Sequence, residues 1–227
     1  MPGSLLKDEV HEALAPYIDA KLQPLGFESK KRLTWVRSID APIRQVLELE
    51  EMRYDRYFLT WGYSFDFVPF FVGTALKWHK QARTAHMSIW SCEHFGKQRP
   101  YLAGFAGREG LINGVSVPHQ THYMYRGVDY LLEELDRANA YWARVTSVLD
   151  LVGLFDEFNR IQGSLTRGYG TYQLARAFCF AHAGRVAEAE TMLDAYISLS
   201  LDQPFQAKAA DQLRLAFETA CLEPWAD

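Results

Sequence analysis

Residues 57–67 read Tyr-Phe-Leu-Thr-Trp-Gly-Tyr-Ser-Phe-Asp-Phe, and their alternation decides the fold. Every second residue is large and apolar or aromatic, namely Tyr57, Leu59, Trp61, Tyr63, Phe65 and Phe67. Because successive side chains of a strand point to opposite faces, the stretch predicts a β-strand with one aromatic face. Such a face can stack bases or a flat ligand, but aromatic residues at this period more often pack under helices as core. We expect core.

Shorter stretches with the same period flank this strand and predict an antiparallel sheet of about four to six strands. The segment Ile43–Glu50 puts Ile43, Gln45, Leu47 and Leu49 on one face, and the turn residues Asp40-Ala41-Pro42 precede it. Further strands are predicted at Leu33–Arg37 and at His86–Cys92. From Ser91 to Gly127 the periodicity is lost and six glycines punctuate the chain, which is typical of a lid or a binding loop.

Helical patterns at both ends of the chain supply the cover for this sheet. Apolar residues recur every four positions from Leu6 to Leu22, which predicts a helix that Pro16 kinks or breaks into two. Steps of three and four residues return from Val128 to Ile161 and predict an amphipathic helix or a helix pair. Beyond a Gly-containing linker at 163–170, the segments Tyr172–His182 and Val186–Leu199 predict a helical hairpin, which a last helix at about Phe205–Leu222 covers.

The predicted fold class is therefore α+β. We expect an α+β domain over residues 1–162, with an antiparallel sheet packed against helices. An all-helical extension over residues 163–227 would pack on it.

Composition and charge favour some classes of protein over others. The chain has 227 residues, of which 48% are hydrophobic, so it can bury a core without disulfides or metals. Its formal net charge of −4 argues against nucleic-acid binding, because phosphate backbones attract basic proteins. The three cysteines are scattered and odd in number, and no run is apolar enough to be a signal peptide or to span a membrane. We therefore expect a cytoplasmic protein.

The N-terminal part resembles an uncharacterised bacterial family of unknown function. The matching residues are Pro16-Tyr17, Gly26-Phe27, Lys30-Lys31 and the run Thr34-Trp35-Val36-Arg37, and the resemblance extends over about residues 5–160. It implies an α+β fold and no known chemistry, and its setting among small bacterial accessory proteins implies protein binding, including toxin neutralisation. Residues 181–190 are similar to a single tetratricopeptide-type unit, which alone is a packing motif.

Motifs for phosphate, dinucleotide, acyl-transfer or zinc chemistry are absent in the expected contexts, so we predict neither a cofactor nor a metal. One alternative remains open, a small enzyme whose site lies within Ser91–Gly127. Its candidate residues are Cys92, His94, His119 and His122, because thiolate and imidazole act as metal ligands or as a nucleophile with its base. Local hydrogen bonding of these side chains is the competing interpretation.

Acidic residues gather at the end of the second strand and its turn. They are Glu48, Glu50, Glu51 and Asp55. Such a cluster can bind a basic partner, but nearby arginines dilute its charge, and such clusters are more often a solvated hairpin edge. With no catalytic motif found, we predict a non-enzymatic protein-binding module. The predicted class is an immunity-type or antitoxin-like inhibitor of a cognate bacterial protein such as a basic toxin, with neither nucleic acid nor membrane as partner.

Overall fold

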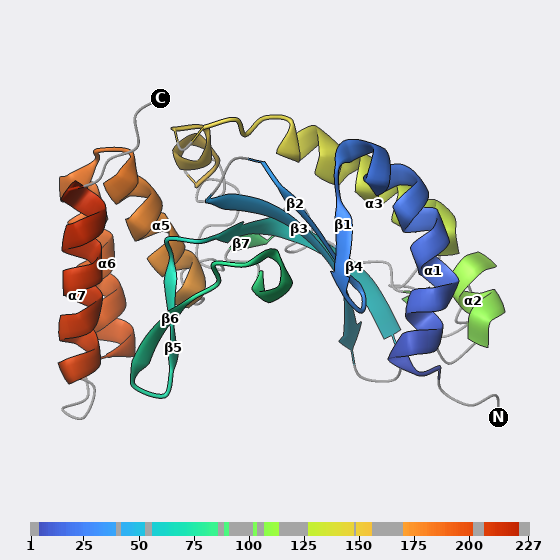
Figure 1. The fold of residues 1–227 in the computed structure, drawn as a ribbon, viewed down its shortest axis with the longest axis horizontal. Coiled ribbons are helices and arrows are strands. Elements are labelled where there is room, and N and C mark those ends of the chain that lie inside the picture. The colour runs from blue at the N-terminus through green and yellow to red at the C-terminus, as the bar shows by residue number, and fades with distance from the viewer. Residues whose placement is uncertain are drawn as a thin grey trace, which may run out of the picture.

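A computed structural model describes most of the chain. The described residues are 5–39, 42–52, 56–85, 89–90, 102–103, 107–113, 127–147, 149–155, 170–201 and 207–222. They form an α+β fold with an antiparallel sheet in the middle, helices at both ends of the chain and a separate two-stranded hairpin (Figure 1). The predicted fold class is thereby confirmed.

The main sheet is built around one long hairpin. Its strands are β1 (Glu28–Lys31), β2 (Thr34–Ser38), β3 (Ile43–Met52), β4 (Arg56–Phe65), β7 (Ile89–Trp90) and β8 (Leu102–Ala103). Strands β1 to β4 lie in sequence order, and both β7 and β8 pair with β4. The β3–β4 register runs without a shift from Ile43 opposite Phe65 to Met52 opposite Arg56. The predicted aromatic strand is therefore β4, which ends two residues before Phe67.

One face of this sheet carries the core, as expected. The register aligns Trp35, Leu47 and Trp61 across three strands, and all three side chains are buried. Helices α1 (Lys7–Leu22) and α3 (Gly127–Trp142) cover them (Figure 1). The indole nitrogen of Trp35 donates a hydrogen bond to Asp19 of α1 at 2.7 Å, so even the polar atom of that ring finds a partner.

The N-terminal helix is continuous through Pro16, so the predicted break into two helices is wrong. A proline inside a helix removes one backbone hydrogen bond. Here the helix buries four apolar side chains at four-residue spacing, Val10, Leu14, Ile18 and Leu22, and this tertiary packing outweighs the loss. The first turn is closed by Glu9, whose carboxylate accepts the backbone N–H of Leu6 at 2.7 Å.

Part of the segment expected to be a loop, Ser91–Gly127, has regular structure. Besides β8 it contains helix α2 (Gly107–Asn113), and Leu111 of that helix is fully buried. The remaining residues of the segment lie outside the described part of the chain, apart from Gly127, which begins α3.

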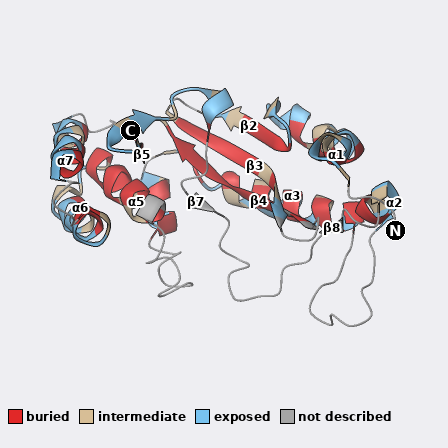
Figure 2. Ribbon diagram, turned by 90° about the horizontal axis from the view of Figure 1, so that it is seen from below, coloured by how far each residue is buried: buried red, intermediate tan, exposed pale blue. Residues whose placement is uncertain are grey.

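The C-terminal helices are α5 (Gly170–His182), α6 (Val186–Ser200) and α7 (Ala207–Leu222), as the periodicity predicts. Residues 149–155, which precede them, are also helical. Helix α5 is buried on nearly all sides, and Phe178 meets Phe217 of α7 edge to face at 5.7 Å. One continuous cluster of buried apolar side chains joins these helices to the sheet. Figure 2 shows the buried residues in red, along the strands of the sheet and along α5. The predicted division at residues 162–163 lies outside the described residues.

A two-stranded hairpin follows β4 and extends beside α7 (Figure 1). It consists of β5 (Pro69–Val72) and β6 (Ala75–Trp78), joined at Gly73-Thr74. After the hairpin, the 3₁₀ turn η2 (Ala82–Thr84) brings Ala85 against the second face of the main sheet, where it packs on Val36 and Val46. No described helix combines the length and the hydropathy needed to cross a membrane.

Candidate binding groove

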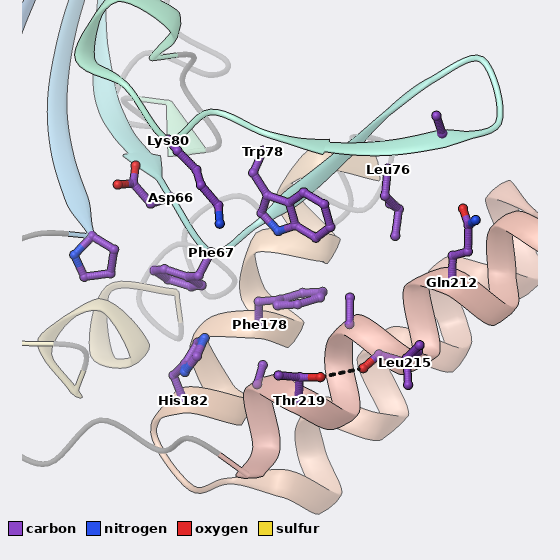
Figure 3. Close-up of a pocket in the computed structure, with 14 residues that line it drawn as sticks. Asp66, Phe67, Leu76, Trp78, Lys80, Phe178, His182, Gln212, Leu215 and Thr219 are labelled. Carbon is purple, nitrogen blue, oxygen red and sulfur yellow. Dashed lines mark hydrogen bonds between the residues drawn. The ribbon is translucent and has the colours of Figure 1, made fainter.

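A groove of about 920 Å³ separates the β5–β6 hairpin from helix α7 (Figure 3). Strand β6 contributes Leu76 and Trp78 to one wall, and both side chains point into the groove. The opposite wall is a stripe of α7, formed by Gln212, Leu215, Ala216 and Thr219. Phe67, Phe178 and His182 lie at the floor. The groove is therefore lined mainly by apolar and aromatic side chains.

The hairpin wall follows from the register of its two strands. Pro69 pairs with Trp78 and Phe71 pairs with Leu76, so these four side chains share one face. Phe71 and Leu76 pack against the core, whereas 38% of Trp78 is exposed. The connecting Gly73 has φ 62°, a left-handed conformation that glycine adopts without strain.

The helix wall follows from the spacing of residues along α7. Residues 212, 215, 216 and 219 are separated by three and four positions, so they form one stripe on the helix surface. None of the four carries a charge. A different stripe, which includes Leu213 and Phe217, is buried against the rest of the molecule. The groove stripe stays open, and Leu215 is 66% exposed.

An ion pair clamps the hairpin to the main sheet at the inner end of the groove. The guanidinium of Arg44 on β3 pairs with Asp66, the residue after β4. It also donates hydrogen bonds to the carbonyl oxygens of His79 at 3.2 Å and of Lys80 at 3.0 Å. Burial lowers the pKa of Arg44 by desolvation, a cost that these contacts offset. One side chain thus holds the start and the end of the hairpin in place.

The same end of the groove carries the positive charge of Lys80. Lys80 lines the groove and its ammonium lies 5.8 Å from the centre of the Trp78 ring. Asp66, the acidic residue of the lining, is already paired with Arg44. Among the residues that the structure describes, Lys80 pairs with no carboxylate. Below it, His182 meets Phe67 edge to face at 4.7 Å.

The residues predicted as an enzymatic site cannot be placed. Cys92, His94, His119 and His122 all lie outside the described residues, so the alternative function stays a prediction. Within the described ranges no group of three or more His, Cys, Asp or Glu side chains is arranged to hold a metal ion.

The predicted acidic cluster is divided between the two faces of β3. Glu51 lies on the face that α1 covers, and its carboxylate is 3.0 Å from the ammonium of Lys7. Glu48 and Glu50 point to the other face by strand alternation, where the hydroxyl of Thr60 donates to Glu50 at 3.3 Å. Asp55 lies outside the described residues. The structure therefore does not bring the three described glutamates together on one surface.

Sequence reasoning missed the groove, although one wall carries a signal. Residues 69–72 and 75–78 are two short, mostly apolar runs on either side of Gly73-Thr74, a pattern typical of a β-hairpin. The other wall gives no comparable signal, because helical periodicity shows which face is buried but not what stands opposite the exposed face.

Comparison of the chain with protein-family models, curated proteins and solved structures gave no match. Function must therefore be inferred from the geometry and chemistry of this chain.

Proposed function

We propose that this protein is a non-enzymatic binding module that holds an apolar segment of a partner protein between the β5–β6 hairpin and α7. The proposal rests on the positions of two large apolar side chains, Trp78 and Leu215. They lie on opposite walls of one concavity and remain substantially exposed, whereas the aromatic residues of β4 are buried. Large apolar side chains gathered in a hollow are typical of sites that bind another molecule.

The energies involved suit a protein partner. Completely burying a leucine side chain contributes about 1.5–3 kcal/mol, and tryptophan is among the residues most enriched at binding hot spots. Two such anchors on facing walls would supply several kcal/mol, which is the scale on which hot spots determine affinity.

The wall that presents Trp78 is also held in position before binding. Arg44 fixes the chain at His79 and Lys80, immediately after β6. On its outer face the hairpin is braced by Phe70, whose ring stacks on His79 with centroids 3.9 Å apart. A wall ordered in advance lowers the entropy cost of association.

We further propose that the partner is a cognate bacterial protein that this chain inhibits in the manner of an immunity protein or antitoxin. This finer assignment is supported by the N-terminal resemblance to small bacterial accessory proteins. The net charge of −4 also suits a basic partner such as a toxin, and Glu48 and Glu50 on β3 are additional contact candidates for it.

Two exposed leucines of the C-terminal helices provide a matched test. Leu215 lines the groove, whereas Leu199 of α6 does not, although it is 71% exposed. Tagged full-length protein would be used to isolate stoichiometric partners from the native cells. We expect one partner to be retained by the wild type and by Leu199→Glu but lost by Leu215→Glu. The proposal fails if no stoichiometric partner is found, or if Leu215→Glu retains it equally.

A further inference from the structure

The walls of the groove favour a helical occupant over an extended one. An extended peptide binds by adding a strand to a free sheet edge through backbone hydrogen bonds. Here β6 presents the side chains of Leu76 and Trp78 to the groove (Figure 3). The facing wall is a helix surface whose stripe has the small residue Ala216 in its middle. Ridges of one helix pack into grooves between the side chains of another, so this wall is suited to a second helix.

The dimensions fit two turns of such a helix. From Gln212 to Thr219 the α7 stripe advances by about 10 Å at 1.5 Å per residue. A helix of two turns therefore matches this stripe in length. Two turns carry apolar residues at positions such as i, i+3, i+4 and i+7, enough to meet both walls.

Charge identifies one more feature of the occupant. The α7 stripe is uncharged, and Asp66 is neutralised by Arg44. Among the described residues of the lining, this leaves the ammonium of Lys80, which Figure 3 shows directed toward the groove from its inner end. An apolar segment that covered this ammonium without pairing it would have to desolvate a charge. A carboxylate at that end of the segment removes the penalty and fixes its register.

We propose, resting on the function proposed above, that the partner segment is a two-turn amphipathic helix with an aspartate or glutamate that pairs with Lys80. Its apolar stripe packs between Trp78 and Leu215. A partner that is basic overall satisfies this requirement with a single local carboxylate.

A helix-display selection on the full-length protein tests the proposal. Fourteen-residue peptides of helix-favouring composition, randomised on one face, would be selected on the wild type and counter-selected on Leu215→Glu. We expect the retained peptides to combine apolar residues at helical spacing with one acidic residue near one end of the apolar stripe. The best peptide and its acid-to-amide analogue would then be synthesised, and their affinities measured by fluorescence anisotropy.

Lys77 supplies the matched control for Lys80. Both are exposed lysines of the same hairpin region, but Lys77 pairs with Phe70 on the face away from the groove. Lys80→Gln should weaken the acidic peptide about fivefold, the upper range for a solvent-accessible ion pair, and leave the amide analogue unchanged. Lys77→Gln should change neither. Lys80→Glu should transfer the preference to peptides with a basic residue at that position.

The outcomes separate this inference from the function on which it rests. If the selected peptides depend on Leu215 but show no preference for an acidic residue, the acidic helix is overturned and protein binding remains. The same holds if Lys77→Gln and Lys80→Gln have equal effects. If the wild type sediments as a dimer and Leu215→Glu sediments as a monomer, the occupant of the groove is a second copy of this chain. That result overturns the inference. If no peptide is selected and dodecanoate binds saturably to the wild type but not to Leu215→Glu, the groove binds a small amphiphile. That result overturns both proposals.

Discussion

Two tryptophans on antiparallel strands show how differently the two sheets of this protein are used. Trp61 of β4 is 2% exposed, because Tyr141 and Trp142 of α3 lie over it with ring centroids 5.2 and 6.0 Å away. Trp78 of β6 also faces a helix, but a groove separates the two. The residue type and the strand alternation are alike in both places. What distinguishes core from candidate interface is whether the facing helix closes the gap.

The largest effect that this comparison predicts is on stability. Trp61→Ala should lower the free energy of unfolding by about 3–5 kcal/mol, because it leaves a cavity under α3. Trp78→Ala should lower it by less than about 1 kcal/mol, since the ring is already partly in water. Chemical denaturation of the two variants measures both values. Equal losses would mean that Trp78 is a core residue, and the comparison would no longer hold.

The next effect concerns the ion pair that connects the two regions. Arg44→Met should cost about 3 kcal/mol, because it strands the carboxylate of Asp66 in a mostly buried position. The double variant Arg44→Met, Asp66→Leu removes both charges and should be more stable than the single variant. Urea unfolding of the three proteins tests this order. A double variant less stable than Arg44→Met would show that the contacts to the His79 and Lys80 carbonyls dominate over the pair.

The sequence predicts the main sheet and the helices that cover it well, because the patterns that indicate them are local. The alternation in β3 and β4 and the four-residue steps in α1 each describe a face that another element buries. The sequence does not predict strand β1, because this strand has no such local pattern. It is short and polar, and its turn to β2 uses Leu33 at φ 59°, where glycine or asparagine would be expected. The backbone N–H of Leu33 donates to His11 of α1 at 3.3 Å, so a tertiary contact fixes a turn that local propensity does not indicate.

The groove could not be predicted because it depends on a relation between distant segments. The sequence predicts a last helix at about Phe205–Leu222, but Leu215 and Leu199 look equivalent in the sequence. Only the structure places the hairpin opposite one of them, more than 130 residues earlier in the chain. The acidic cluster shows the reverse case: residues adjacent in sequence, Glu50 and Glu51, point to opposite faces of β3.

A smaller effect is expected at the start of the helical residues 149–155, where Ser147 and Asp150 form a capping box: the hydroxyl of Ser147 accepts the backbone N–H of Asp150 at 3.2 Å. The carboxylate of Asp150 accepts hydrogen bonds from the backbone and hydroxyl groups of Thr146 and Ser147 at 2.9–3.1 Å. The pKa of Asp150 is lowered, chiefly by the backbone hydrogen bond from Thr146. Asp150→Ala removes these hydrogen bonds and should cost about 1 kcal/mol at neutral pH, the usual loss for a helix cap.

The sign of the pH dependence follows from the direction of that shift. A carboxyl group with a lowered pKa in the folded state stabilises the fold above its ordinary pKa. This contribution is lost as the pH falls through the lowered pKa. The difference between the wild type and Asp150→Ala, measured by thermal unfolding as a function of pH, should shrink in acid. A difference that stays constant below about pH 3 would assign the effect to the packing of the side chain.

The smallest effect is expected at the second ion pair of β3. Glu51 pairs with Lys7 at 3.0 Å, but 36% and 59% of the two side chains are exposed, in contrast to the mostly buried Arg44 and Asp66. Exposed pairs contribute about 0.2–1 kcal/mol and are screened by salt. Glu51→Gln should therefore cost less than about 0.5 kcal/mol, and a double-mutant cycle with Lys7→Gln should show the coupling vanish in high salt. If the coupling instead exceeded about 1 kcal/mol and persisted in salt, Glu51 and Lys7 would form an enclosed pair that contributes to the stability of the fold like Arg44 and Asp66.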